Sequence, residues 1–432
     1  MTGSTFWGSA PDPRSAGAPP LRVVALADTD SYVKWAAALL SSLPAGSEVE
    51  LLVVETPLAV SRTQMQSALV GSGMDAEHVR RVQFADLARI VGEMAPDAVL
   101  VAARGPVGRV MIAAMAELDP RPVIVSGLPG ISIPATTAAL IHRTQSDVFV
   151  LHSTREVSTF RALAERRGLV QRFALARLPF ARSSVASTSE NTRATDLVFA
   201  SQAIVPRERA DRMRVARLLV AAARADPEKR VVVKERTVTG EHQTHEQRYG
   251  YPDLLRRLAP LPPNLVVSTE SMSHAFDSAE GLVTVSSTAA IEAIARGIPV
   301  IALDTFGVDD SLINPVFEGS GLFGSEAAVI AREFRLPPSE WLTRNYFHDP
   351  AKDNWVAQVE DLVVLRRAGA LPPKPARDRR GGRVRDIWER KLALGRMDRS
   401  VAGTAVYAVG IPLRFVLRPI LRPYFRRRLS AA

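Results

Sequence analysis

The chain has 432 residues, of which 47% are hydrophobic, so it can form two domains with sizeable cores and wholesale disorder is excluded. It contains no cysteine, which excludes disulfides, thiolate metal sites and cysteine nucleophiles. The net charge is +10, but residues 366–432 hold eighteen Arg and Lys against four Asp and Glu. The preceding residues therefore carry a net charge of −4, which excludes a basic nucleic-acid-binding body.

Residues 1–20 lack the basic start and apolar core of a signal peptide, and we expect a flexible arm and a cytoplasmic protein. From residue 21 to 180, apolar runs without polar alternation are separated by helical patterns. The predicted strands are Arg22–Asp28, Glu48–Glu55, Val79–Phe84, Asp97–Ala103, Pro122–Ser126 and Asp147–His152. Strands of this kind are buried on both faces, so the region predicts an α/β, doubly wound, Rossmann-like domain.

Residues 181–195 are polar and lack an apolar rhythm, which predicts a linker. The alternation then restarts and predicts a second doubly wound domain over residues 196–365, facing the first across a cleft. Its predicted strands are Asp196–Ser201, Arg230–Lys234, Asn264–Ser268, Leu282–Val285 and Val300–Leu303. The amphipathic segment Trp355–Arg367 is predicted to be its last helix.

The stretch from Gly281 to Asp304 predicts a strand, a turn of hydroxyl residues, a short helix and another strand. Gly297 stands where a left-handed residue ends a helix, and Pro299 prevents its continuation. Ser286, Ser287 and Thr288 lie between the strand and the helix, where backbone N–H groups and hydroxyls favour an anion, and a phosphate is the anion that we expect.

Other candidates are chosen because ligands of parallel sheets lie beyond the carboxyl ends of the strands. Lys234 and Arg236 follow one such strand and are candidates to bind the same phosphate, although they could equally be surface charges. Glu292 could accept a hydrogen bond from a ribose hydroxyl, or be an ordinary helix glutamate.

Asp28 and Asp30 end the first strand of the chain. Either could be the general base that deprotonates an acceptor hydroxyl, although both could instead cap the following helix. Arg104 and His152 end other strands and are weaker candidates, and the loop over residues 127–134 is expected to approach a ligand or the facing domain.

His242 and His245 are three residues apart, but no third metal ligand is indicated, so they are assigned to a possible donor loop and no metal site is expected. The motifs GxGxxG, GxxxxGK[ST], GxSxG and HExxH are absent. Their absence argues against dinucleotide oxidoreductases, P-loop enzymes and α/β-hydrolases.

The segment SSTAAIEAIARGIPVIAL resembles the donor site of GT-B glycosyltransferases and the related nucleotide-sugar epimerases. In those enzymes a Ser/Thr pair at a helix start binds the donor phosphate and a glutamate shortly after binds the ribose, which implies these roles for Ser287, Thr288 and Glu292. The similarity extends distantly to capsule sialyl- and Kdo-type transferases. The whole chain, ADTDSYVKW included, resembles an actinobacterial family classed as glycosyltransferases.

One departure concerns the donor. The sialyl- and Kdo-type enzymes carry Lys-x-His-Pro at a strand end, whereas Lys234 is followed by Glu235 and Arg236. This weakens a CMP-sugar assignment more than the glycosyltransferase assignment.

The tail over residues 366–432 combines an apolar run, Val401–Leu413, with arginines that alternate with apolar residues beyond it. The run is too short to span a bilayer of about 30 Å. Apolar segments between cations suit an anionic membrane surface. Docking onto the protein's own body or onto another subunit is one alternative, and a disordered basic tail is the other.

The sequence therefore predicts a metal-independent GT-B glycosyltransferase without a cofactor. Its substrates would be a nucleotide-sugar and a cell-envelope polysaccharide or lipid-linked acceptor, at the inner face of the plasma membrane. The alternatives are a nucleotide-sugar epimerase of the same fold and a non-catalytic GT-B-like scaffold.

Overall fold

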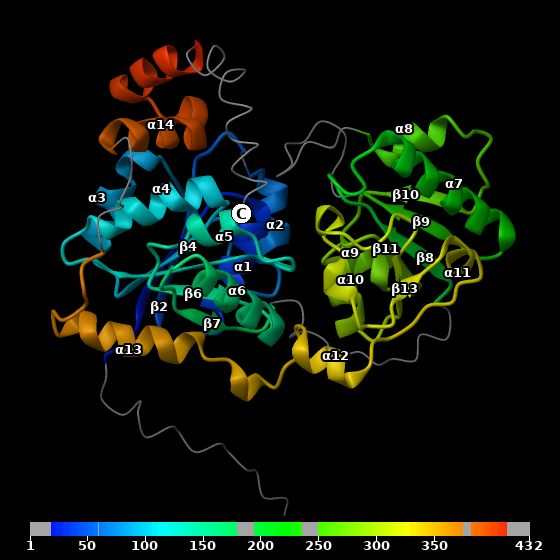
Figure 1. The fold of residues 1–432 in the computed structure, drawn as a ribbon, viewed down its shortest axis with the longest axis horizontal. Helices are drawn as coiled ribbons and strands as arrows, with labels where there is room; N and C mark the ends of the chain where they lie inside the picture. Colours follow the sequence, from blue (N-terminus) through cyan, green and yellow to red (C-terminus); the bar gives the residue numbers. More distant parts are fainter. Residues whose placement is uncertain (1–18, 59, 179–193, 236–248, 375–381, 413–432) are drawn as a thin grey trace, which may run out of the picture.

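The computed structural model describes residues 19–58, 60–178, 194–235, 249–374 and 382–412. They form two α/β units that lie side by side, with the return segment around α12 (Ser339–Arg344) between them (Figure 1). Most of the predicted arm at residues 1–20, most of the linker at 181–195, and residues 236–248 and 413–432 lie outside the described residues.

The first unit is a parallel sheet. Its strands, in spatial order, are β3 (Arg80–Val82), β2 (Glu48–Val54), β1 (Arg22–Ala27), β4 (Ala98–Ala102), β5 (Val123–Gly127), β6 (Val148–Leu151) and β7 (Phe173–Leu175). Side chains alternate across β1, so Val23 and Ala25 pack in one core and Val24 and Leu26 in the other. Helices cover both faces, as predicted for uninterrupted apolar strands. They are α1 (Asp30–Leu40), α2 (Arg62–Leu69), α3 (Phe84–Met94), α4 (Gly105–Ala116), α5 (Thr137–Ile141) and α6 (Thr154–Arg166).

The second unit repeats this order. Its parallel strands are β10 (Leu265–Ser268), β9 (Val231–Lys234), β8 (Asp196–Ala200), β11 (Ala279–Thr284), β12 (Val300–Leu303) and β13 (Phe323–Gly324). Its helices are α7 (Arg209–Ala225), α8 (Tyr251–Arg256), α9 (Met272–Phe276), α10 (Ala289–Ala295) and α11 (Glu326–Ile330). Gly297 has φ +73°, in keeping with the predicted left-handed end of α10. Two doubly wound domains are therefore present, as the sequence predicts.

The sequence placed α13 (Trp355–Arg367) in the wrong core. Trp355, Val359 and Leu362 are buried in the first unit, although the predicted second domain extends to residue 365. The chain returns from the second unit to the first just before α13. There Asn354 makes two hydrogen bonds with the backbone of Leu175 in β7. Periodicity identifies a helix and its apolar face, but not which sheet that face meets.

The described part of the tail also docks onto the first unit. Arg367 bonds the carboxylate of Asp97, and Leu394, in α14 (Gly382–Leu394), is fully buried beside α3 and α4. Figure 1 shows α14 lying next to α4. Arg367 and α14 therefore pack on the protein's own body, as one of the predicted alternatives for the tail describes.

Candidate functional site

The carboxyl edges of the two sheets meet at one point. The loop after β5 reaches across to the second unit, where a Cβ added to Gly130 would lie 3.1 Å from the Thr288 hydroxyl oxygen. Ile133 of the same loop is buried in the second unit's core. The prediction that this loop approaches the facing domain is thus confirmed, and the hydroxyl turn lies at the domain boundary.

The turn itself is held by neighbouring strand ends. Gln202, just after β8, donates from Nε2 to Ser286 Oγ (3.0 Å) and accepts the Ser286 N–H at Oε1 (2.9 Å). The Ser287 N–H donates to Thr284 Oγ1 at 3.1 Å. The Ser287 hydroxyl accepts the Ala289 N–H at 3.2 Å, so three backbone donors of this segment are satisfied within the protein. Ser287 and Thr288 are both partly exposed, and their hydroxyls can still donate at the boundary. The Thr288 hydroxyl has no hydrogen-bond partner among the described residues.

Lys234 brings a buried positive charge to the same sheet edge. Its side chain is 4% exposed, and Nζ donates to the carbonyl of Glu235 at 2.5 Å. The Glu235 carboxylate accepts from Ser201 Oγ at 2.9 Å and from the Tyr251 N–H at 3.3 Å. This network holds the ends of β8 and β9 together. Arg236, His242 and His245, which the sequence groups with this site, lie outside the described residues.

Glu292 lies one helical turn after Thr288, so the two residues share one side of α10. Its carboxylate pairs with Arg296 at 3.2 Å, and the guanidinium of Arg296 lies 5.2 Å from the Phe276 ring centroid. A ribose hydroxyl would therefore meet a carboxylate that a neighbouring arginine already orients. The ribose role itself stays a prediction.

In the first unit, Asp28 is fully buried. Both oxygens accept hydrogen bonds from Arg104, from the backbone N–H at 3.2 Å and from Nε at 2.8 Å. Burial raises the pKa of Asp28, and the charge of Arg104 opposes that rise. A carboxylate without an exposed oxygen cannot reach an acceptor hydroxyl in this conformation. Asp30 is partly exposed at the start of α1 and is the better placed of the two predicted bases.

His152, the other strand-end candidate, is a core residue. It is fully buried, accepts the Trp35 Nε1–H at 2.7 Å on Nε2 and bonds the Ala176 carbonyl through Nδ1. Nε2 also lies 2.9 Å from the Leu128 carbonyl oxygen, so both ring nitrogens have partners inside the protein. His152 follows a strand, as ligand-binding residues of parallel sheets do, but its ring points into the protein and not into the boundary between the domains.

Two important groups had no sequence signal. Arg143 is buried and donates to the carbonyls of Ala103 and Gly127 and to the hydroxyl of Tyr32. Glu156 is buried and accepts from three groups that lie far apart in the chain. These donors are the Ser132 N–H (2.7 Å), the His152 N–H (2.9 Å) and the Tyr346 hydroxyl (2.6 Å). Most of these partners are backbone atoms, which carry no residue-type pattern.

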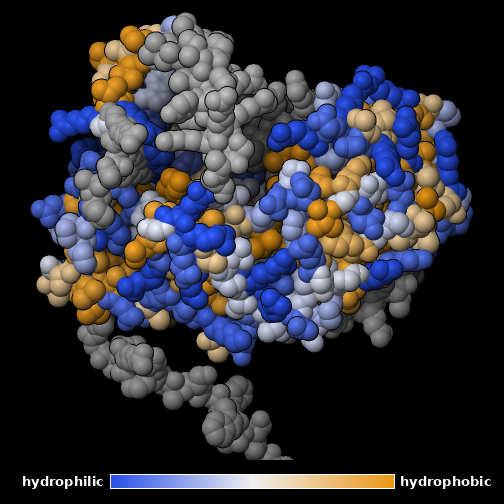
Figure 2. Space-filling model, viewed as in Figure 1, coloured by the Kyte–Doolittle hydropathy of each residue, from blue (hydrophilic) through white to orange (hydrophobic). Residues whose placement is uncertain are grey.

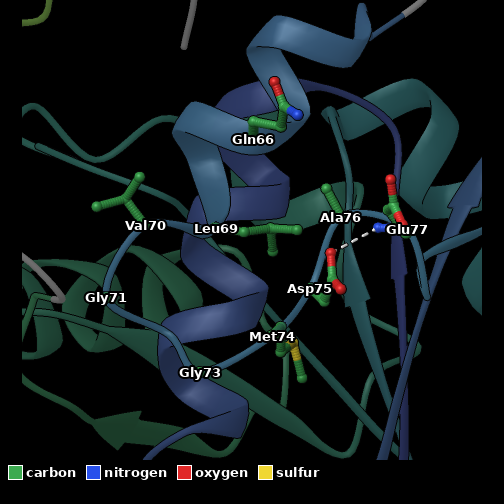
Figure 3. Close-up of a pocket in the computed structure, with 9 residues that line it drawn as sticks. All are labelled: Gln66, Leu69, Val70, Gly71, Gly73, Met74, Asp75, Ala76 and Glu77. Atoms are coloured by element: carbon green, nitrogen blue, oxygen red, sulfur yellow. Dashed lines mark hydrogen bonds between the residues drawn. The ribbon is translucent and has the colours of Figure 1, made fainter.

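Figure 3 shows an open pocket of about 500 Å³ elsewhere, at the carboxyl end of α2. Its polar side chains are Gln66, Asp75 and Glu77, and they do not converge on one point. The lining residues lead into β3 and so lie away from the carboxyl edge. No cluster of potential metal ligands occurs within the described ranges.

Comparisons with known proteins agree with this architecture. A family model described as "Putative glycosyltransferase (DUF6716)" matches residues 23–362. No curated protein matches the chain. Among solved structures it is similar to the S. aureus MnaA–UDP co-structure, with 10% identity, a TM-score of 0.52, and coverage of 82% of this chain and 99% of that one.

The chain is also similar to the UDP-GlcNAc 2-epimerase from Methanocaldococcus jannaschii (10% identity, TM-score 0.51, 79% of this chain and 99% of that one). A third structure is a "putative UDP-N-acetylglucosamine 2-epimerase" from Listeria monocytogenes (9% identity, TM-score 0.53, 82% and 98%). At these identities the likeness shows the fold alone, which is the two-domain GT-B arrangement.

Proposed function

Because the chain belongs to the family described as "Putative glycosyltransferase (DUF6716)", we propose that it is a metal-independent glycosyltransferase. It would transfer a sugar from a nucleotide-sugar to a glycan or lipid-linked acceptor of the cell envelope, at the cytoplasmic face of the membrane. The observation that carries the proposal is the meeting of Gly130 and Thr288, which puts the hydroxyl turn at the boundary between two doubly wound domains. The buried Lys234 ends another strand at the same sheet edge.

The donor's phosphates would bind Thr288 and Ser287 through their hydroxyls, with Lys234 supplying the positive charge. Charge-assisted hydrogen bonds and fixed dipoles can neutralise a leaving phosphate without a metal. Glu292 would accept a hydrogen bond from the ribose, and Asp30 would take the acceptor's proton. UDP in the S. aureus structure makes UDP-sugars the first donors to test.

A thermal-shift screen against UDP-, CMP-, GDP- and CDP-sugars tests the proposal. We expect stabilisation by one nucleotide class, and release of the nucleotide only when an acceptor is present. Conversion of the donor sugar without acceptor would instead identify an epimerase. No stabilisation by any nucleotide would identify a scaffold and overturn the proposal.

Gly130→Ala should weaken donor binding several-fold. The new methyl group would lie 3.1 Å from Thr288 Oγ1, closer than an ordinary van der Waals contact, so the threonine must move. Isothermal titration with the stabilising nucleotide measures the effect. Gly92→Ala in α3, where the nearest atom would be Leu118 Cδ2 at 3.7 Å, is the control and should leave affinity unchanged. Equal affinity of the Gly130→Ala variant and the wild type would place the donor elsewhere.

The membrane contact is assigned to the C-terminal hairpin, which we define as α14 together with the helical residues 401–412. Trp388 stacks on Tyr407 with 5.9 Å between ring centroids, and Arg390 bonds Asp398 at 3.1 Å. Val401 and Val409 project from it with 86% and 71% exposure. Figure 2 shows this apolar surface at one corner of the molecule. Within the described residues, no helix is long and apolar enough to cross a bilayer.

The double variant Val401→Asp/Val409→Asp should reduce binding to phosphatidylcholine–phosphatidylglycerol vesicles by about tenfold or more. Two apolar contacts would be lost and two negative charges would face an anionic surface. Co-sedimentation measures the partition. Val170→Asp, at a fully exposed valine of the loop before β7, is the matched control. An equal loss in the control, or no loss in the double variant, would contradict a docking role for the hairpin.

A further inference from the structure

We propose that the first unit holds an anion-binding site of its own, in which Arg104 binds a phosphate group of the acceptor. The inference rests on the proposed glycosyltransferase function for its biological meaning, and on the charges around Asp28 for its physical basis. The ligand class is a phosphate ester, attached either to a lipid or to a soluble sugar.

The first argument is a charge balance inside the protein. Asp28 is the carboxylate that bonds Arg104, and the charge of Arg143 also acts on it. All the hydrogen bonds that Arg143 donates go to neutral oxygens, at the Tyr32 hydroxyl (2.9 Å) and at backbone carbonyls such as Ala103 (3.0 Å). Two guanidinium groups thus share one buried carboxylate. A buried charge without full compensation is costly, so the edge favours an additional anion.

The second argument is the way Arg104 is held. Its Nε and backbone N–H bind Asp28, whereas neither Nη atom has a hydrogen-bond partner among the described residues. The side chain is 28% exposed. A guanidinium fixed at Nε and open at both Nη atoms can present two parallel donors to a phosphate. Asp28 is therefore a positioning residue that acts through Arg104.

The surroundings agree with a positive local field. The His142 ring lies directly over Gly105, where any Cβ would overlap Nδ1. Burial, followed by the charges of Arg109 and Arg143, lowers the pKa of His142. The ring is partly exposed beside the start of α4. Arg109 itself pairs with Glu389 of α14, which connects this edge to the C-terminal hairpin.

The experiment measures binding of three probes to the full chain saturated with the nucleotide that stabilises it most. The probes are farnesyl phosphate, farnesol and glucose 1-phosphate, and the variants are Arg104→Gln, Arg104→Lys and Asp28→Asn. Arg89→Gln, at an exposed arginine paired with Glu93, is the control. We expect the wild type to bind a phosphate ester more tightly than farnesol, and Arg104→Gln to lose about 10-fold to 100-fold of that affinity.

Arg104→Lys should recover part of the affinity, and Asp28→Asn should weaken it while nucleotide binding stays unchanged. A loss of phosphate-ester affinity with unchanged nucleotide affinity separates a ligand-binding role from a general loss of structure. Preference for farnesyl phosphate or for glucose 1-phosphate identifies the lipid or the soluble source. Equal binding of farnesyl phosphate and farnesol together with no binding of glucose 1-phosphate, or wild-type affinity in Arg104→Gln, would overturn the inference. If no nucleotide binds but the Arg104-dependent affinity persists, the proposed function fails and this site remains.

Discussion

Lys234→Met is expected to lower kcat/KM for the nucleotide-sugar by about 100-fold to 1,000-fold. Methionine preserves the length of the buried side chain but removes the ammonium group, which lies at the carboxyl end of β9, on the same sheet edge as the hydroxyl turn. Removal of one fixed donor from a site that stabilises developing negative charge commonly costs about this much. Steady-state release of nucleotide, with saturating acceptor, measures the loss.

Lys229→Met is the matched control, because Lys229 precedes the same strand at its opposite end and pairs with Glu280 at 2.9 Å. Its effect on kcat/KM should be within about twofold. Chemical denaturation of both variants separates catalysis from folding. Similar activity of the two variants would show that the charge of Lys234 is not used by the reaction, and would favour the region around Arg236 outside the described residues.

The two sheets were predictable because each strand is an uninterrupted apolar run, such as Val231–Lys234, and such runs are stable only when both faces are covered. The hydroxyl turn was predictable because strand ends in parallel sheets converge on one edge. Both predictions rest on local sequence patterns. The structure contains the two parallel sheets and the hydroxyl turn between β11 and α10.

The features of the fold that the sequence did not predict depend on contacts between distant parts of the chain. α13 has a readable apolar stripe, but the pair of hydrogen bonds between Asn354 and Leu175 decides which sheet it covers. α14 was hidden in a basic tail because its contacts with the first unit, such as the buried Leu394 and the ion pair between Glu389 and Arg109, leave no periodic apolar pattern in the sequence. Asp28 was correctly placed at a strand end, but its full burial follows from Arg104, 76 residues away.

Glu156 shows most clearly what local patterns miss, because it joins the two units. Its carboxylate accepts the Tyr346 hydroxyl at 2.6 Å across 190 residues, and Tyr346 is buried in the second unit's core. Tyr346 has φ +63°, a left-handed conformation that a bulky residue adopts only where its surroundings enforce it. Burial raises the pKa of Glu156, and the hydrogen bond from Tyr346 leads the contacts that oppose the rise.

Glu156→Ala should therefore lower the free energy of unfolding by about 3–6 kcal/mol. The substitution leaves three buried donors without an acceptor, and each such donor costs about 1–3 kcal/mol. Urea denaturation followed by circular dichroism measures the change. A loss of this size is a large part of the stability of a typical protein, so Glu156→Gln, which retains one acceptor oxygen, provides a milder second variant.

Tyr346→Phe tests the connection between the units more narrowly. It removes one hydroxyl and leaves the two backbone donors to Glu156 in place, so the expected cost is about 1–2 kcal/mol. Because this bond crosses the domain boundary, its loss should also broaden the unfolding transition or divide it into two. Glu77→Ala, at an exposed pair with Arg62, should change the free energy of unfolding by less than about 1 kcal/mol. If Glu156→Ala were no more destabilising than Tyr346→Phe, the buried carboxylate would not be what holds the β5 loop against Thr288, and the packing of Ile133 in the second core would have to do so.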